Sequence, residues 1–181
     1  MKAKNIPSVE ECYEIMKKRM LPHIKEHSEQ VMKVAVSITD HLKPNVIINK
    51  SLVIAASLLH DITKTESLTT REPHDITGGI FLRELGYYDV ADIVEEHVHL
   101  KNYDINENLK EKEIVFYADK RVMHTKIVSV EDRISDLVIR YGKSELIKKH
   151  IIENKNSILN IEKKINNNML KDLNDVILCL K

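Results

Sequence analysis

The sequence contains little glycine, proline or aromatic side chain. Among 181 residues there are 4 Gly, 4 Pro and no Trp, and aromatic residues make up 4%. Glycine and proline form the tight turns that join many short strands, so their scarcity argues against an all-β fold and favours helices. Net charge is also missing, because 28 Lys and Arg balance 28 Asp and Glu. Without a long-range field, neither nucleic acid nor an anionic membrane is expected as a partner.

Cysteine and long apolar segments are scarce too. Cys12 and Cys179 lie near opposite ends of the chain, with no metal-binding spacing and too few thiols for a disulfide scaffold. No apolar segment approaches the ~20 residues that span a bilayer, and the N-terminus "MKAKNIPSVEECYEIMKKRM" lacks the apolar centre of a signal peptide. These absences predict a soluble, cytoplasmic protein.

Helix signals occur along the whole chain. A chain of this length can fill one domain, and we expect residues 1–181 to form a single all-α helical bundle. Ser8 with Glu11 is a capping box that opens the first helix, and Asp89 is expected to cap the fifth. The segment "TKTESLTTREPHD" is expected to be a polar loop. The other predicted helices cover about 22–42, 50–61, 74–85, 89–99, 109–123 and 129–142, followed by a helical tail from 144 that breaks near 166–168.

Six polar residues interrupt the apolar faces or the buried ends of these helices. His97, for example, follows Val90, Ile93 and Val94 at helical spacing, and Asp119 lies in the same stripe as Val115 and Val122. Burying an unpaired carboxylate costs several kcal/mol, and burying an unbonded imidazole is also unfavourable. The six residues are His27, His60, Asp61, His74, His97 and Asp119.

Each of these residues alone has an ordinary explanation. A single histidine on an apolar face is more often hydrogen-bonded in the core than bound to a metal. Asp119 could pair with Lys120 or Arg121, but both neighbours are expected on another side of the helix. A shared cation would satisfy all six residues at once, so we favour a metal site.

The ligand set favours Mn, Fe, Co, Ni or Zn over Ca, with Mg also considered, because it contains imidazoles and carboxylates but no thiolate. His60 and Asp61 are ~100° apart around a helix, so they can share one metal only near the helix end, or the carboxylate can bridge two metals. Two ions ~3.5–4 Å apart could hold a hydroxide and polarise a phosphoryl oxygen. Lys64 could then bind a phosphate, or it could be a solvated lysine at a helix end.

The chain resembles the HD superfamily of metal-dependent phosphohydrolases, whose signature is a His, an adjacent His-Asp pair and a distant Asp. The signature is present in "EHSEQVMKVA" (His27), "LLHDITK" (His60 and Asp61) and "FYADKRV" (Asp119). The resemblance implies a helical core over about 20–142 with a helical extension over 143–181. It also implies a metal held by those four residues.

Some branches of this superfamily carry two further histidines that recruit a second metal, with the Asp of the pair bridging. His74 in "HDITGGIFLRELG" and His97 in "IVEEHVHL" are the candidates, with His99 as the alternative to His97. The pattern is similar to the bacterial branch that splits diadenosine tetraphosphate symmetrically. A common variant of the His-Asp motif has glycine at the position where this chain has Thr63.

The expected function is hydrolysis of a phosphate ester or anhydride in a small molecule, most plausibly a nucleotide, by metal-bound hydroxide. His60 and Asp61 are the expected catalytic residues, while Lys64, with Lys120 or Arg121, would contact the phosphate. The alternative is a non-catalytic metal- or nucleotide-binding sensor or interaction module. The loops over 63–73 and 100–112 are expected to border the pocket. The tail beyond Ser144 could pack against a second copy in a homodimer or cover its own core.

Overall fold

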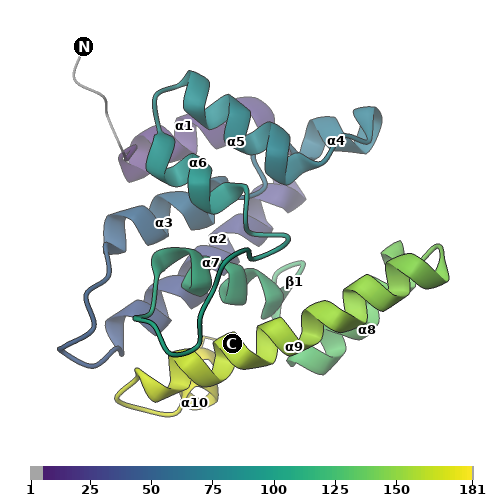
Figure 1. Ribbon diagram of the computed structural model, residues 1–181. Coiled ribbons are helices and arrows are strands. Elements are labelled where there is room, and N and C mark those ends of the chain that lie inside the picture. Colours follow the sequence, from purple (N-terminus) through teal and green to yellow (C-terminus); the bar gives the residue numbers. More distant parts are fainter. Residues whose placement is uncertain (1–5, 181) are drawn as a thin grey trace.

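The computed structural model describes residues 6–180 and confirms the all-α prediction (Figure 1). Helices make up nearly all of the regular structure, and a short antiparallel hairpin pairs Val122 with Ile127. The elements are α1 (Val9–Arg19), α2 (Pro22–Asp40), α3 (Lys50–Leu59), α4 (Lys64–Thr70), α5 (His74–Glu84), α6 (Tyr88–Val94), α7 (Glu111–Lys120), β1 (Val122–Met123), β2 (Lys126–Ile127), α8 (Val130–Tyr141), α9 (Glu145–Asn167) and α10 (Leu173–Leu178).

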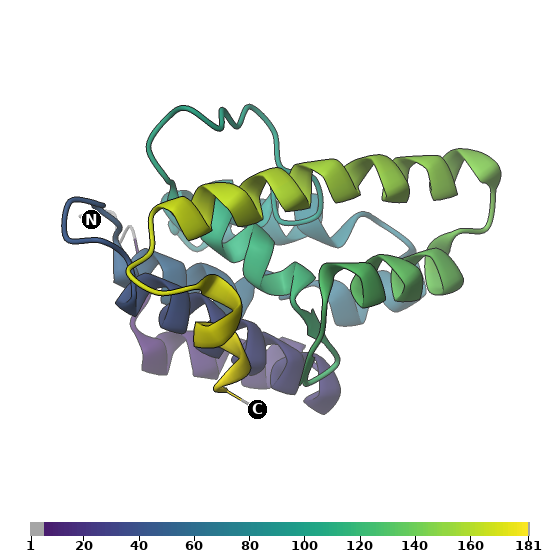
Figure 2. The same ribbon diagram turned by 90° about the horizontal axis from the view of Figure 1, so that it is seen from below.

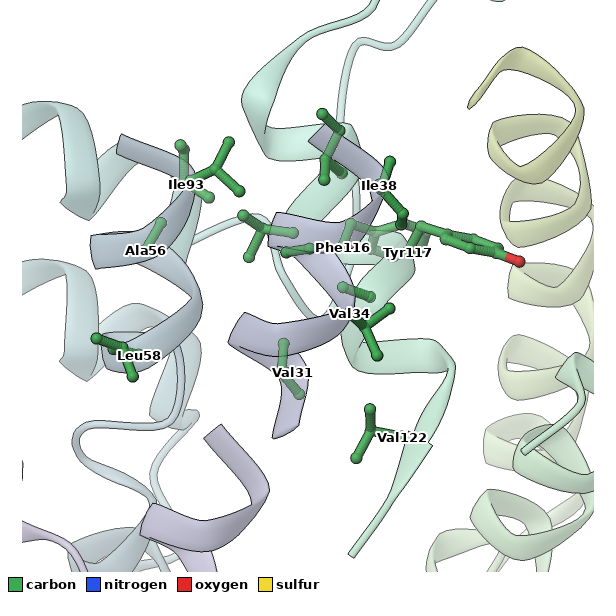
Figure 3. Packing of buried hydrophobic residues seen from close by; sticks show 14 of the residues in the cluster. Val31, Val34, Ile38, Ala56, Leu58, Ile93, Phe116, Tyr117 and Val122 are labelled. Carbon is green, nitrogen blue, oxygen red and sulfur yellow. The ribbon is translucent and has the colours of Figure 1, made fainter. Parts of the chain in front are cut away.

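Helices α2, α3 and α7 form the centre of the bundle and pack against one another. Figure 3 shows Val31 and Ile38 of α2 beside Phe116 of α7, with Leu58 of α3 nearby. All four side chains are fully buried. Each such side chain contributes roughly 1.5–3 kcal/mol on removal from water. These three helices also carry four of the six polar residues of interest, so the packed centre fixes where those residues lie.

The C-terminal helices lie along one side of this centre. Helices α8 and α9 run antiparallel, and α9 passes alongside α7 (Figure 2). Tyr117 of α7 points its hydroxyl toward α9 (Figure 3), where it donates a 2.5 Å hydrogen bond to Glu162. The division of the chain into a core over about 20–142 and an extension over 143–181 stays a prediction.

The predicted capping box at Ser8 is confirmed, because the Ser8 hydroxyl accepts from the Glu11 N–H and the Glu11 carboxylate accepts from the Ser8 N–H. The predicted end of the fourth helix at Gly86 is also confirmed. Gly86 has φ +86°, a left-handed conformation that glycine adopts without steric cost. Other boundaries differ from the sequence prediction.

The predictions for three segments were wrong. The segment over 63–75, expected to be a loop, contains α4, which has no buried residue and therefore no apolar stripe to reveal it. The fifth helix begins at Tyr88 with Tyr87 as its N-cap rather than Asp89, and it ends at Val94 rather than near residue 99. The sixth ends at Lys120, where the chain turns into the β1–β2 hairpin instead of continuing to Met123.

The two cysteines occupy opposite environments. Cys12 is fully buried in α1, where burial raises the pKa of its thiol to about 12, whereas Cys179 is exposed. Only the thiolate reacts quickly, and at pH 8 a thiol with this pKa is ionised on the order of one part in ten thousand. We expect a thiol reagent at pH 8 to modify one cysteine in the folded protein and two in denaturant. Rapid modification of both in the folded protein would contradict the position of α1.

No helix within residues 6–180 is both long enough and apolar enough to cross a membrane.

Candidate metal centre and pocket

Five helices or their ends bring the six polar residues to one place. His27 lies on α2 and His74 is the first residue of α5. His60 is the C-cap of α3 and Asp61 follows it, so both project from the end of the central apolar helix. The remaining two, His97 and Asp119, lie just beyond α6 and near the end of α7. Residues from widely separated parts of the chain therefore meet at one cluster, which we call the His-Asp cluster.

Asp61 lies at the middle of the His-Asp cluster, and its two oxygens face different histidines. Oδ2 lies 3.5 Å from His60 Nε2 and 4.0 Å from His27 Nε2. Oδ1 lies 3.1 Å from His74 Nε2 and 3.5 Å from His97 Nε2. His27, His60 and Asp61 thus form one group that could hold a metal ion, and Asp61, His74 and His97 form a second. A carboxylate with one oxygen toward each group is suited to bridge two ions.

Asp119 extends the first of these groups. Its Oδ1 lies 3.1 Å from His27 Nε2 and 3.8 Å from His60 Nε2. Two carboxylates and two imidazoles therefore converge on the His27 side of the cluster. Nitrogen and oxygen donors without a thiolate suit first-row transition metals better than a purely oxygen-liganded ion such as Ca²⁺.

Three of the histidines are oriented by main-chain carbonyls. Nδ1 of His60 donates to the Ser57 carbonyl at 2.8 Å, Nδ1 of His97 to Val94 at 2.6 Å, and Nδ1 of His27 to His124 at 2.9 Å. Because a carbonyl can only accept, Nδ1 of each ring carries a proton, and Nε2 faces the cluster, where that of His27 hydrogen-bonds Asp119 Oδ1 at 3.1 Å. Metal-binding histidines are commonly fixed in this way.

The cluster is buried and incompletely hydrogen-bonded. His60 is 0% exposed and Asp61 is 1% exposed. Nevertheless, His60 Nε2 and Asp61 Oδ1 make no hydrogen bond with any residue in the described range 6–180. Leaving such atoms unpaired is costly, and a cation would satisfy both. The residues present therefore fit a divalent metal ion.

The charges around the cluster favour ionised carboxylates. Burial would raise the pKa of Asp61, but Lys64 and His60 hold it well below its ordinary value. Burial likewise opposes ionisation of Asp119, and Lys120 and His27 lower its pKa well below the ordinary value. Burial lowers the pKa of His97 to about 4, so this imidazole is neutral at pH 7, and its Nε2 lies 3.2 Å from His74 Nε2 within the cluster.

The lysines lie close to these carboxylates. Lys64 Nζ lies 2.8 Å from Asp61 Oδ2, and Lys120 Nζ lies 2.6 Å from Asp119 Oδ2. The expectation that Lys120 emerges on another side from Asp119 was wrong, because its long side chain folds back at the end of α7. Arg121 was also a phosphate candidate, but it instead bonds the Tyr117 hydroxyl, the Val128 carbonyl and Asn174.

The cluster opens into a pocket of about 600 Å³. Lys64 and Leu68 from the segment over 63–73 line it, as expected, but no residue of the segment over 100–112 does. The opposite wall comes instead from α8 and α9, with Leu137 and Ile151 among its apolar residues and Arg133 among its cations. Sequence reasoning missed Arg133, whose position on an amphipathic helix gives no local sign that it is buried.

His97, and not His99, lies in the His-Asp cluster. His99 lines the pocket but belongs to neither metal-compatible group within the described residues. The helical spacing pointed to the correct histidine although α6 ends three residues earlier. The chain makes one further helix-like turn after α6, because the His97 N–H donates to the Val94 carbonyl.

Comparisons with known proteins agree with this geometry. A sequence model of the family described as "HD domain" matches residues 24–123, a segment that contains the whole His-Asp cluster and ends before α8. A protein of Methanocaldococcus jannaschii named "Uncharacterized protein MJ0778" is 29% identical over 168 residues, covering 85% of this chain and 98% of that protein. No solved structure matched the chain significantly.

Proposed function

The chain belongs to the HD-domain family, and from this premise we propose that it is a metal-dependent phosphohydrolase that cleaves a phosphate ester or anhydride of a small molecule, with a nucleotide as the expected substrate. The observation that carries the proposal is the placement of Asp61, whose two oxygens face two separate sets of histidines. Those sets border a pocket that also contains cationic side chains.

The proposed metal-binding residues are His27, His60, Asp61 and Asp119 for one divalent ion, and Asp61, His74 and His97 for a second. Mn, Fe, Co, Ni and Zn suit these donors, and Mg is also a candidate. Bound there, such ions would supply Lewis acidity to a phosphoryl oxygen and lower the pKa of water. Asp61 would orient both sites, and His60 would fix the first from the end of α3.

Lys64 and Lys120 are the proposed phosphate contacts. In the metal-free arrangement each ammonium neutralises a carboxylate of the cluster. With divalent ions held by those carboxylates, both ammonium groups would be free to hold phosphoryl oxygens and offset their charge. The phosphate would then lie between the lysines and the His-Asp cluster.

The rest of the pocket suits the organic part of such a substrate. A volume of about 600 Å³ falls within the range of small-molecule sites, and apolar residues such as Leu68, Ile134, Leu137 and Ile151 line its outer part. A nucleobase has flat apolar faces that can pack against such side chains. This combination of a charged inner end and an apolar outer end supports a nucleotide over free inorganic phosphate.

We expect phosphate release from at least one member of a panel of mononucleotides, cyclic nucleotides, guanosine tetraphosphate and dinucleoside polyphosphates. Each compound is tested with Mn²⁺, Fe²⁺, Co²⁺, Ni²⁺, Zn²⁺ and Mg²⁺ supplied separately. Products are separated directly by ion-exchange chromatography, so that cleavage that releases no inorganic phosphate, such as symmetric cleavage of a dinucleoside polyphosphate, is also detected. The metal content of the purified protein is measured in parallel.

Two results would count against the proposal. A folded protein that binds none of these metals would contradict the assignment of the His-Asp cluster. A protein that binds metal and nucleotide but releases no product from any compound would support the alternative function, a non-catalytic sensor. A homodimer stays a prediction, which the molar mass in solution by light scattering tests.

A further inference from the structure

One cation in the pocket has no role in the function proposed so far. Arg133 lies on α8, beyond the segment that matches the HD-domain family, and its side chain is only 6% exposed although it lines the pocket. Arginine is seldom buried to this degree without full pairing. Within residues 6–180, its Nε is one of six buried side-chain nitrogen or oxygen atoms that have no hydrogen-bond partner.

The guanidinium is held from one side only. Its Nη1 donates to Asp136 at 3.2 Å, and this is the one hydrogen bond that the described residues make with it. Nη2 lies 3.7 Å from Asp119 Oδ1, which is an ion-pair distance and too long for a hydrogen bond. The Nε and Nη2 groups share one edge of the planar guanidinium. Two parallel N–H groups on such an edge match a pair of phosphoryl or carboxylate oxygens.

The charge balance explains why this edge requires an anion. Without metal, Asp61, Asp119 and Asp136 face four cations, Lys64, Lys120, Arg133 and Arg140, leaving one excess positive charge. One divalent ion raises that excess to three, and two ions raise it to five. Arg133 is then not needed to neutralise Asp119, and keeping it buried beside the ions is favourable only if an anion joins them.

We propose that Arg133 is a substrate-binding residue that holds the phosphoryl group through its Nε and Nη2 edge, with Asp136 as its positioning residue. The inference rests on the proposed function and deepens it, because it assigns part of phosphate recognition to α8. Lys64 and Lys120 approach the phosphoryl group from α4 and α7, whereas Arg133 approaches it from the opposite wall.

The test measures binding of inorganic phosphate to the Zn²⁺-loaded full-length protein by calorimetry, which needs no turnover. Arg133→Met keeps most of the side-chain volume and should weaken phosphate binding by roughly 10- to 100-fold, the usual effect of losing one or two charge-assisted hydrogen bonds. Arg133→Lys keeps the charge but lacks the planar edge, and we expect an intermediate loss. Zinc content and helical content should match the wild type in both variants.

Lys143→Met is the control for the loss of one positive charge. Lys143 follows the C-cap of α8, is exposed and does not line the pocket. Removing this charge should change the phosphate dissociation constant by less than about twofold. An equal loss in both variants would overturn the proposal in favour of a general electrostatic effect.

Other outcomes also decide the proposal. Unchanged phosphate affinity in a folded, zinc-loaded Arg133→Met protein would overturn it, and so would loss of zinc, which would make Arg133 a structural counter-ion of Asp119. If the variants do not fold, the Nε–H signal of Arg133 in the NMR spectrum of the zinc-loaded wild type replaces them. It should shift on addition of phosphate, and an unmoved signal at saturation would refute the contact.

This experiment separates the two proposals. If the wild type hydrolyses no compound of the nucleotide panel but its phosphate binding depends on Arg133, the proposed hydrolase activity is contradicted and the anion site is supported. If the wild type is active, and Arg133→Met has the same KM and the same phosphate affinity as the wild type, the hydrolase is supported and the anion site is contradicted. Where both hold, we expect Arg133→Met to raise the KM of the identified substrate at least as strongly as it lowers kcat.

Discussion

Replacing Asp61 with asparagine should lower phosphohydrolase activity by at least about a thousandfold and remove bound metal. Asparagine has almost the same shape, so helical content should remain close to that of the wild type. It lacks the negative charge that Asp61 directs toward both groups of histidines. Loss of a residue that merely orients a ligand typically costs 10- to 100-fold, and loss of a carboxylate shared by two sites should cost more.

The measurement combines metal content by mass spectrometry with turnover of the substrate that the panel identifies. Asp89→Asn, an exposed aspartate on α6, is the control for the loss of one negative charge and should behave as the wild type. An Asp61→Asn protein that keeps its metal and full turnover would remove the basis of the proposed mechanism.

The second large effect concerns stability and lies away from the cluster. Lys164 of α9 and Glu113 of α7 form an ion pair of 2.7 Å, and their exposed fractions are 2% and 0%. Lys164 Nζ also donates to the Asp104 carbonyl, and the other oxygen of Glu113 accepts from the Lys110 N–H. The pair therefore joins α9 to α7 and to the segment that precedes α7.

Lys164→Met should lower the free energy of unfolding by about 3–5 kcal/mol, because it leaves Glu113 buried without its partner. Urea denaturation measures the change, and the exposed neighbour Lys163→Met provides the control with an expected change within about 0.5 kcal/mol. The double variant with Glu113→Leu should recover part of the loss, since no unpaired charge remains. A Lys164→Met midpoint equal to that of the wild type would show that the pair does not join the two helices.

The sequence predicted the cluster better than it predicted the pocket. His27 and Asp119 were found because each interrupts an apolar stripe, a signal that helical spacing reveals directly. His60 was found because a run of apolar residues ends on it. His97 was found because one further turn preserves that spacing beyond the end of α6. Which of these residues bind a metal stays a prediction.

The features that sequence reasoning missed depend on tertiary packing or on side-chain flexibility. Arg133 occupies an ordinary position in an amphipathic helix and becomes buried only because α8 lies over the pocket. Lys120 was misplaced because a ~100° step around the helix fixes the direction of Cβ, whereas four methylene groups allow the ammonium to return to Asp119. Helix α4 was missed because it buries none of its residues and therefore has no apolar stripe, although Glu66 pairs with Arg19 and Thr65 accepts a hydrogen bond from the Leu21 N–H.

The hydrogen bonds from His27, His60 and His97 to main-chain carbonyls have a consequence for evolution. In many metalloproteins a carboxylate side chain orients each histidine, so one mutation at that second position loosens the metal. Here the acceptors at residues 57, 94 and 124 are peptide groups, which persist whichever amino acid occupies those positions. Divergent descendants of this chain can therefore exchange the side chains behind the three imidazoles without losing the orientation of the rings, provided that the local backbone path is kept.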